Sequence, residues 1–319
     1  MVMKKNIYYW KKSLETPEPV GDPFYSSDEI IVTDAELIKK VERLRELIIS
    51  YCVLSEKGNM NGTSEILNEI YDIIISIDKI QYTEFIAFWK TLDISYSVFE
   101  KLPNKKNVLK GLLKRYCERR RKLYDKLGYS NITVQALYDT GSSRKKGVSG
   151  IDKIIYVIQD KLKKNITHAK DISALMRSPN TYFLPDKGDK GLFSIFCKKM
   201  GIRYLFGKDH QGKQPDIVLK MNGEFFIIEA KHINETGGAQ DKQIIEVIEF
   251  IRYSEKLDKV HYVSFIDGVY FNNFIWLGDK SKTKISEQKK DIEKYLKNNP
   301  KNFFVNTKGL SSLLKDLKN

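Results

Sequence analysis

A hairpin-like stretch from Gln214 to His232, QPDIVLKMNGEFFIIEAKH, constrains the fold of this chain more than any other segment. Its central Asn222-Gly223 predicts a two-residue turn of the kind that closes tight hairpins. Apolar runs on both sides of the turn predict two antiparallel strands. Side chains alternate along a strand, so we expect Glu229 and Lys231 on one face and Ala230 on the other.

Charged residues stand at the open end of this hairpin. Asp216 opens the first strand, and Glu229 and Lys231 end the second. Because an antiparallel turn brings these ends together, two carboxylates and an ammonium should meet there. Such a group is suited to a divalent cation with a positive side chain beside it. The alternative is a surface hairpin with an incidental salt bridge, since Glu and Lys two residues apart on a strand are ordinary.

The segments around the hairpin predict a defined order of elements. A helix is expected at Gly188–Met200 and a short strand at Ile202–Phe206. After the hairpin, an amphipathic helix is expected from Ala239 to Tyr253 and a buried strand from Val260 to Ile266. The predicted order is therefore helix, strand, strand, strand, helix, strand.

Pro215, Asp216, Glu229 and Lys231, placed in this order of elements, resemble the PD-(D/E)XK nuclease superfamily, to which many type II restriction endonucleases belong. The resemblance covers about residues 178–270. It implies an α/β (α+β) fold with a central mixed sheet flanked by helices, preceded here by a mainly helical N-terminal region. We expect DNA recognition or dimerisation in residues 1–170 and the PD-(D/E)XK catalytic domain in residues 171–319.

The resemblance also implies a Mg²⁺ site and its ligands. Asp216, Glu229 and the carbonyl of Ala230 would hold the metal, and Asp216, Glu229 and Lys231 would form the catalytic set. The metal lowers the pKa of a bound water and stabilises the charged transition state, while Lys231 would orient or deprotonate that water.

The sequence departs from the family at the helix before the hairpin, where many members add an acid. The expected helix face, Leu192–Phe196, carries none. Asp186 and Asp189 lie just upstream and could serve, but they are also explained as turn and N-cap residues. One or two metals per site therefore remain open.

Charge points to a polyanionic partner. The chain has a formal net charge of +14, but residues 1–100 hold 11 basic and 17 acidic residues. By contrast, residues 101–126 hold 11 Lys or Arg and two acids. This segment predicts a helix along a phosphate backbone, with a solvated helix surface as the alternative. The expected DNA contacts in it are Arg119, Arg120, Arg121 and Lys122.

Two further segments are expected to touch DNA. Tyr138–Gly147 reads as a flexible loop of hydroxyls, glycines and cations that suits groove entry or phosphate contact, or else as a linker. Gln240 and Gln243 stand in the first turn of the helix after the hairpin. Asp241 could be a helix cap, and His210 either approaches phosphate or is a plain loop residue. The loop residues expected at DNA are Ser142, Ser143, Arg144, Lys145 and Lys146.

The remaining features bound the class of protein. Residues 1–32 read as an irregular arm, and the capping box at Thr33–Glu36 predicts that a bundle of helices starts there. Tyr270–Trp276 could extend the sheet. Three widely spaced cysteines favour a reducing cytoplasm over a zinc site or a disulfide frame. No apolar run approaches the roughly 20 residues of a membrane span, and no signal peptide is apparent.

Together these features predict a Mg²⁺-dependent type II restriction endonuclease that hydrolyses phosphodiester bonds of a specific double-stranded DNA sequence. Cutting both strands usually takes two active sites, so a homodimer is expected. A cognate DNA methyltransferase is expected in the same restriction-modification system. The alternatives are a DNA repair or junction-resolving nuclease of the same fold, an RNA-directed nuclease, and a non-catalytic DNA-binding protein.

Overall fold

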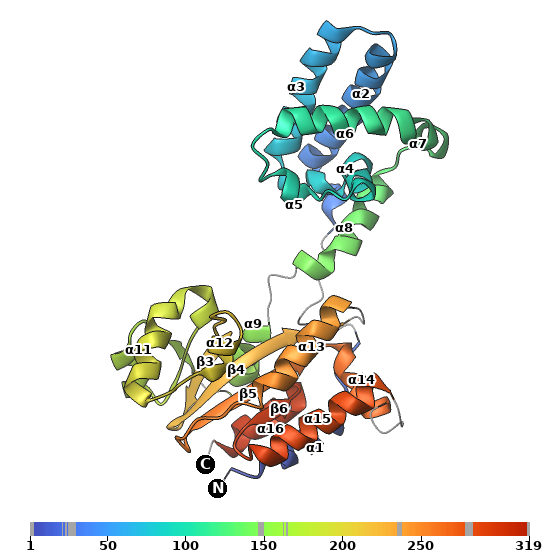
Figure 1. Cartoon of the computed structure of the whole chain (residues 1–319). Helices are drawn as coiled ribbons and strands as arrows, with labels where there is room; N and C mark the ends of the chain where they lie inside the picture. The colour runs from blue at the N-terminus through green and yellow to red at the C-terminus, as the bar shows by residue number, and fades with distance from the viewer. Residues whose placement is uncertain are drawn as a thin grey trace. The chain divides into compact units, whose positions relative to one another are not determined.

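The structure is a computed structural model that describes residues 3–20, 22, 24, 30–145, 150–161, 163, 165–234, 238–277 and 283–317. The chain forms two compact units (Figure 1). We call Ser27–Lys146 the helical unit, and Met1–Ser26 together with Gly147–Asn319 the sheet unit. The helical unit is thus an insertion in the sheet unit, and the expected boundary between residues 170 and 171 lies inside the sheet unit.

The helical unit has a hydrophobic core of its own. Leu44, Ile74, Trp89 and Leu113 belong to one buried cluster that includes no residue of the sheet unit. The helices are α2 (Ala35–Glu56), α3 (Met60–Ser76), α4 (Glu84–Trp89), α5 (Tyr96–Phe99), α6 (Lys105–Arg119), α7 (Arg121–Leu127) and α8 (Asn131–Lys145), with 3₁₀ turns at Ile31–Thr33, Asp78–Tyr82 and Lys90–Leu92.

The start of α2 confirms the predicted helix and moves its cap by one residue. The side chain of Asp34, and not that of Thr33, accepts a hydrogen bond from the backbone N–H of Leu37 at 3.1 Å. An aspartate in this position also stabilises the positive end of the helix dipole.

The expectation that no disulfide is present is wrong. Cys52 on α2 and Cys117 on α6 are joined to each other across 65 residues of sequence. The two cysteines meet because α2 and α6 pack together, which their spacing along the chain does not reveal. The cysteine pattern therefore gives no support for a reducing compartment.

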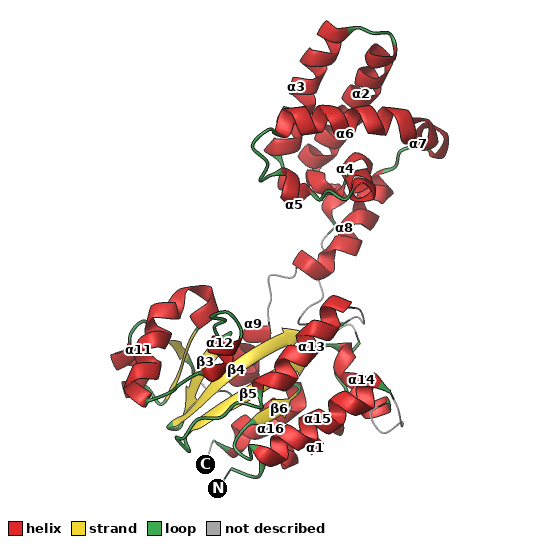
Figure 2. Cartoon of the chain, in the orientation of Figure 1, coloured by secondary structure: helices red, strands yellow, loops and turns green. Residues whose placement is uncertain are grey.

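The sheet unit is built on a mixed six-stranded sheet with strands in sequence order (Figure 2). The pairs β1–β2, β4–β5 and β5–β6 are parallel, and β2–β3 and β3–β4 are antiparallel. The strands are β1 (Thr167–His168), β2 (Asn180–Phe183), β3 (Ile217–Met221), β4 (Glu224–His232), β5 (Val260–Asp267) and β6 (Phe303–Val305).

Helices cover both faces of this sheet. Those of the sheet unit are α1 (Asn6–Leu14), α9 (Gly150–Tyr156), α10 (Ile172–Arg177), α11 (Lys190–Met200), α12 (Leu205–Asp209), α13 (Gly238–Phe250), α14 (Asn272–Trp276), α15 (Lys284–Asn298) and α16 (Thr307–Asp316). Shorter turns lie at Val157–Lys161, Pro185–Asp189 and Val269–Phe271. Ile154 of α9 and Leu313 of α16 pack on one face, and Phe196 of α11 and Val247 of α13 belong to clusters on the other.

Several sequence expectations are wrong in detail. Ile202–Phe206 is not a strand, because Tyr204 takes a left-handed conformation (φ 42°) and α12 starts at the next residue. The strand that pairs with β3 is instead β2. Tyr270–Trp276 does not extend the sheet but forms a 3₁₀ turn and α14.

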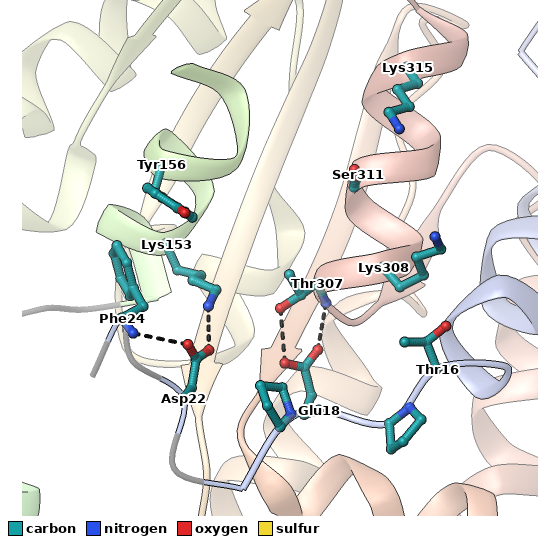
Figure 3. A pocket seen from close by; sticks show the side chains of 12 residues that line it. Thr16, Glu18, Asp22, Phe24, Lys153, Tyr156, Thr307, Lys308, Ser311 and Lys315 are labelled. Carbon is teal, nitrogen blue, oxygen red and sulfur yellow. Dashed lines mark hydrogen bonds and ion pairs between the residues drawn. The ribbon is translucent and has the colours of Figure 1, made fainter. Parts of the chain in front are cut away.

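The N-terminal arm is also more ordered than expected. It contains α1, and its following residues are tied to the sheet unit (Figure 3). The carboxylate of Glu18 accepts hydrogen bonds from the backbone N–H and hydroxyl of Thr307 at 2.8 and 3.0 Å. Asp22 forms an ion pair with Lys153. The N-terminal arm is thereby held against α9 and the start of α16.

Glu18 is 3% exposed. Burial raises the pKa of its carboxyl to about 7, although the hydrogen bonds from Thr307 act to lower it.

Among the described residues, no helix is long and apolar enough to cross a membrane.

Candidate metal and catalytic centre

The predicted hairpin is confirmed. β3 and β4 pair in the register Ile217 with Ile228 and Met221 with Glu224. Asn222 and Gly223 form the turn with φ of 49° and 86°, a left-handed pair that asparagine and glycine adopt most readily. Since the register of a hairpin follows from its turn, this dipeptide decides which residues meet at the open end.

At the open end, the carboxylate of Asp216 lies against the second strand. Its Oδ2 accepts a hydrogen bond from the backbone N–H of Ala230 at 2.8 Å. The N–H of Asp216 in turn donates to the carbonyl of Ile228 at 3.1 Å. The side chain is therefore positioned by backbone groups of β4.

Asp216, Glu229 and Lys231 lie on the sheet face that α13 covers. They share the strand alternation of Val218 and Ile227, which pack on that face. The hydroxyl of Ser264, opposite Glu229 on β5, donates to the carbonyl of Val247 on α13 at 2.6 Å.

Glu229 is the centre of the site and is 0% exposed. Its Oε1 accepts hydrogen bonds from the ammonium groups of Lys231 and Lys213, both at 2.6 Å. Its Oε2 is buried and makes no hydrogen bond within the described part of the chain. One oxygen of this carboxylate is thus neutralised by lysines, and the other is available to a further positive group.

Lys213 and Glu246 are site residues that sequence reasoning missed. Lys213 precedes β3, and its Nζ forms ion pairs with both Glu229 and Glu246 of α13. Lys231 lies 3.8 Å from the same Glu246 oxygen. One signal was present for Glu246, because it stands one helical turn after Gln243, which was expected near DNA.

The loop before Lys213 is tightly built. A Cβ on Gly207 would lie 2.6 Å from the Tyr204 ring and 2.7 Å from the Lys213 carbonyl oxygen, so a larger residue would clash there. The His210 ring stacks on Phe206, and its Nε2 lies 3.3 Å from Glu249 of α13. His210 therefore links this loop to α13, and its approach to phosphate stays a prediction.

Burial and charge shift the two titrating groups beside Glu229. Burial, reinforced by the charge of Glu229, raises the pKa of Asp216 to about 6, although both lysines and the Ala230 N–H act in the opposite direction. Burial by itself would lower the pKa of Lys231, but the charges of Glu229 and Asp216 outweigh it and the pKa is raised. In this state Lys231 is an ammonium that carries positive charge.

The oxygen atoms around Glu229 fit a hard divalent cation. The Oε2 of Glu229, which makes no hydrogen bond to a described residue, and the carboxylate of Asp216 are oxygen ligands of the type that Mg²⁺ accepts. In the described ranges, no three His, Cys, Asp or Glu side chains gather into a metal-binding cluster. A two-carboxylate site suits Mg²⁺, which keeps several of its waters.

Of the two acids upstream of the hairpin, Asp189 has a local role. Asp189 accepts a hydrogen bond from the backbone N–H of Leu184 at 2.8 Å and pairs with His168 at 2.6 Å. Asp186 is exposed in the same turn. The interpretation of Asp189 as a turn residue is confirmed. Its side chain makes no capping hydrogen bond to α11, because it accepts from Leu184 at the other end of the turn.

The residues expected after the hairpin lie at the start of α13. Gln243 is exposed and Gln240 half-exposed. Asp241 pairs with Lys284 at 2.5 Å. His232 makes contacts with Asp267 and Asn234 at 3.2 and 2.7 Å.

The basic segment of the helical unit is helical, as predicted. Of its four expected DNA contacts, two side chains are exposed and two make contacts within the unit. Arg119 and Lys122 are exposed. Arg121 pairs with Glu56 and Asp125, and the guanidinium of Arg120 lies 5.6 Å from the centre of the Phe88 ring. Arg120 and Arg121 therefore stabilise the unit itself.

A more coherent basic surface runs along α6. We define the α6 basic strip as the exposed residues Lys110, Lys114, Arg115, Arg119 and Lys122, the last just beyond the helix. None of them pairs with a carboxylate among the described residues. Their spacing of four residues along α6 places Lys110 above Lys114 and Arg115 above Arg119.

The loop expected at Tyr138–Gly147 is largely helical, because α8 continues to Lys145. Ser142, Ser143, Arg144 and Lys145 lie in this last part of α8, and Lys146 lies outside the described residues. A helical backbone here fits the start of the segment, where Tyr138 is buried in the core of the helical unit.

Comparison of the chain with protein-family models, with curated proteins and with solved structures finds no match in any of the three. What the chain does is therefore inferred from its residues and their geometry.

Proposed function

We propose that this chain is a Mg²⁺-dependent endonuclease of the PD-(D/E)XK type that hydrolyses phosphodiester bonds of a specific double-stranded DNA sequence. The observation that carries the proposal is the convergence of Asp216, Glu229 and Lys231 at the open end of the hairpin. Glu229 is fully buried there and keeps one oxygen without a hydrogen bond among the described residues. A wholly incidental surface salt bridge would not bury its carboxylate in this way.

The order of elements supports the same proposal. α10, β2, β3, β4, α13 and β5 follow the order helix, strand, strand, strand, helix, strand that the resemblance implies. β2, β3 and β4 form an antiparallel meander, and β5 is parallel to β4. α11 and α12 stand between β2 and β3, so the expected order arises from partly different segments.

In the proposed site, Asp216, Glu229 and the carbonyl of Ala230 hold Mg²⁺. The metal, when bound, supplies an acidified water and neutralises charge at the scissile phosphate. Lys231, held as an ammonium by Glu229, orients the attacking water and stabilises the negative charge that develops on the phosphoryl oxygens. α13 and β3 exclude bulk water from Glu229.

The α6 basic strip gives this enzyme a second DNA surface, on the helical unit. Four cations on α6 and Lys122 just beyond it, none paired with a carboxylate among the described residues, match the regular negative charge of a phosphate backbone. The proposal keeps the partners that the sequence predicts: a homodimer on duplex DNA and a cognate methyltransferase.

Digestion of several long duplex DNAs with Mg²⁺ tests the proposal. Wild type should give discrete bands, Asp216→Ala should give none, and Asp291→Ala, which removes an exposed acid of α15, should behave as wild type. A smear from wild type would instead favour a non-specific nuclease. Preferential cleavage of four-way junctions would favour a resolvase, and binding without any cleavage would rule out an enzyme.

A further inference from the structure

Lys213 occupies a place between two acids that its sequence position does not suggest. Its ammonium group lies 2.6 Å from Oε1 of Glu229 and forms a second ion pair with Glu246 of α13. Lys231 already neutralises the same Glu229 oxygen at 2.6 Å. Two lysines therefore share one carboxylate oxygen, while Oε2 of Glu229 makes no hydrogen bond to a described residue.

The charges explain what the second lysine does. Asp216, Glu229 and Glu246 carry three negative charges when ionised, and Lys231 carries one positive charge. Without Lys213 these four groups sum to −2, which is the charge that a divalent cation balances. With Lys213 in place the sum is −1, and a divalent cation would meet an ammonium group already bound to its ligand.

We propose that Lys213 is an internal counter-ion that holds Glu229 and Glu246 together before a divalent metal binds, and that the metal displaces it. This inference rests on the proposed metal site, and it assigns a positioning role to a residue outside the Asp216, Glu229 and Lys231 set. Once displaced, the ammonium of Lys213 stands at the rim of the site, where a phosphate anion is the complementary partner.

The loop that carries Lys213 is suited to this exchange. Its backbone is fixed, because the N–H of Gly212 donates to the carbonyl of Gly207 at 2.7 Å and that of Lys213 donates to His210 at 3.0 Å. The side chain is 27% exposed, whereas Glu229 is fully buried. Lys213 can therefore move its charge toward solvent by rotating its side chain, with no change in the backbone.

Isothermal titration of the full-length protein with Mg²⁺ alone, without DNA, tests the inference. Lys213→Gln removes the competing charge and should bind Mg²⁺ on the order of tenfold more tightly than wild type, or about 1.4 kcal/mol. Lys213→Arg keeps the charge and should bind as wild type does. Lys208→Gln, an exposed lysine five residues earlier, is the matched control and should also leave the affinity unchanged.

A dissociation constant of Lys213→Gln equal to or weaker than that of wild type would overturn the inference, and so would a failure of Mg²⁺ to bind either protein. Thermal unfolding of each variant without metal shows whether Lys213→Gln still folds. If it does not, Lys213→Met and the Lys213→Arg comparison carry the same test, with the same outcomes. Tighter binding by the uncharged variant would support the inference even if wild type cleaved no DNA, so the two proposals fail separately.

Discussion

At the scale of single residues, Asp216 at the open end of the hairpin lowers the stability of the fold when it is ionised. Asp216 has a pKa raised to about 6 by burial and by the charge of Glu229. At neutral pH the ionised carboxylate therefore costs the folded state free energy relative to the unfolded chain. Acids that destabilise a fold and stand together in a buried group are more often part of a functional site than of a structural one.

Replacement of Asp216 by Asn should separate stability from activity. We expect Asp216→Asn to lose at least about 100-fold in DNA cleavage, because an amide does not replace an ionised metal ligand. Its free energy of unfolding should stay unchanged or rise by up to about 3 kcal/mol at neutral pH. Urea unfolding and a cleavage assay on the same samples measure both, and a variant that unfolds earlier while cleaving normally would contradict the prediction.

Glu18 makes stability depend on pH. Its pKa is raised from 4.5 to about 7 by burial, so the folded chain holds this proton more tightly than the unfolded chain does. Between these two values the folded state binds more protons, and its stability falls as the pH rises. The effect is complete above about pH 7 and reaches at most about 3 kcal/mol.

Glu18→Gln isolates this effect, because the amide keeps an acceptor for Thr307 and cannot ionise. The variant should match wild type at pH 5 and exceed its free energy of unfolding at pH 8, as measured by urea denaturation. Equal differences between the two proteins at both pH values would exclude Glu18 as the titrating group.

At the scale of elements, only some of the basic residues on and beside α6 are exposed, which a count of charges in the sequence does not show. The expected contacts Arg120 and Arg121 are occupied within the helical unit, whereas Lys110 and Lys114 lie exposed on the strip. A helix exposes one face and uses the other for packing, so only part of a basic run can reach DNA.

Removal of two charges from the strip should weaken DNA binding in a salt-dependent way. For Lys110→Gln with Lys114→Gln, the slope of log K against log salt concentration should fall by about 1.8, at roughly 0.9 per phosphate contact. The matched control, Lys39→Gln with Lys57→Gln, removes the same charge from exposed positions of the same unit. Identical slopes for the two double variants would argue against the strip as the contact surface.

The link between α2 and α6 gives the helical unit a covalent constraint. A bond that closes 65 residues reduces the freedom of the unfolded chain by about 4 kcal/mol in the loop-entropy description. Cys52→Ser should lower the free energy of unfolding of this unit by an amount of that order. Cys197→Ser is the control, because Cys197 is not part of the disulfide, and it should leave the stability of this unit unchanged. Thermal unfolding with and without reductant measures it, and reductant should not affect the Cys52→Ser variant.

At the scale of the whole molecule, the hydrophobic clusters of the described residues divide between the two units, and none includes residues of both. The buried cluster of the helical unit draws on residues 31–138, and the three clusters of the sheet unit draw on residues outside that range. Units that share no core do not have to unfold together.

We therefore expect two transitions in calorimetry. Reductant should move only the transition of the helical unit, since Cys52 and Cys117 both belong to it. Mg²⁺ should move only that of the sheet unit, through the proposed binding to Asp216 and Glu229. A single cooperative transition that responds to both additions would show that the units are energetically coupled.

Short-range features of the sequence determined the hairpin and most of the helices. Asn222-Gly223 dictates a left-handed turn, and the turn and strand alternation together dictate that Asp216, Glu229 and Lys231 share a face. These are local consequences of backbone geometry, so they can be predicted from neighbouring residues.

The tertiary structure alone decided which residues far apart in the sequence contact each other. It brings Lys213 and Glu246 to Glu229, joins Cys52 to Cys117, and returns the N-terminal arm to α16. Such contacts depend on how helices dock on the sheet and on each other, and no periodicity along the chain encodes them. That Asp216, Glu229 and Lys231 lie together could therefore be predicted from sequence, whereas the approach of Lys213 and Glu246 to Glu229 could not.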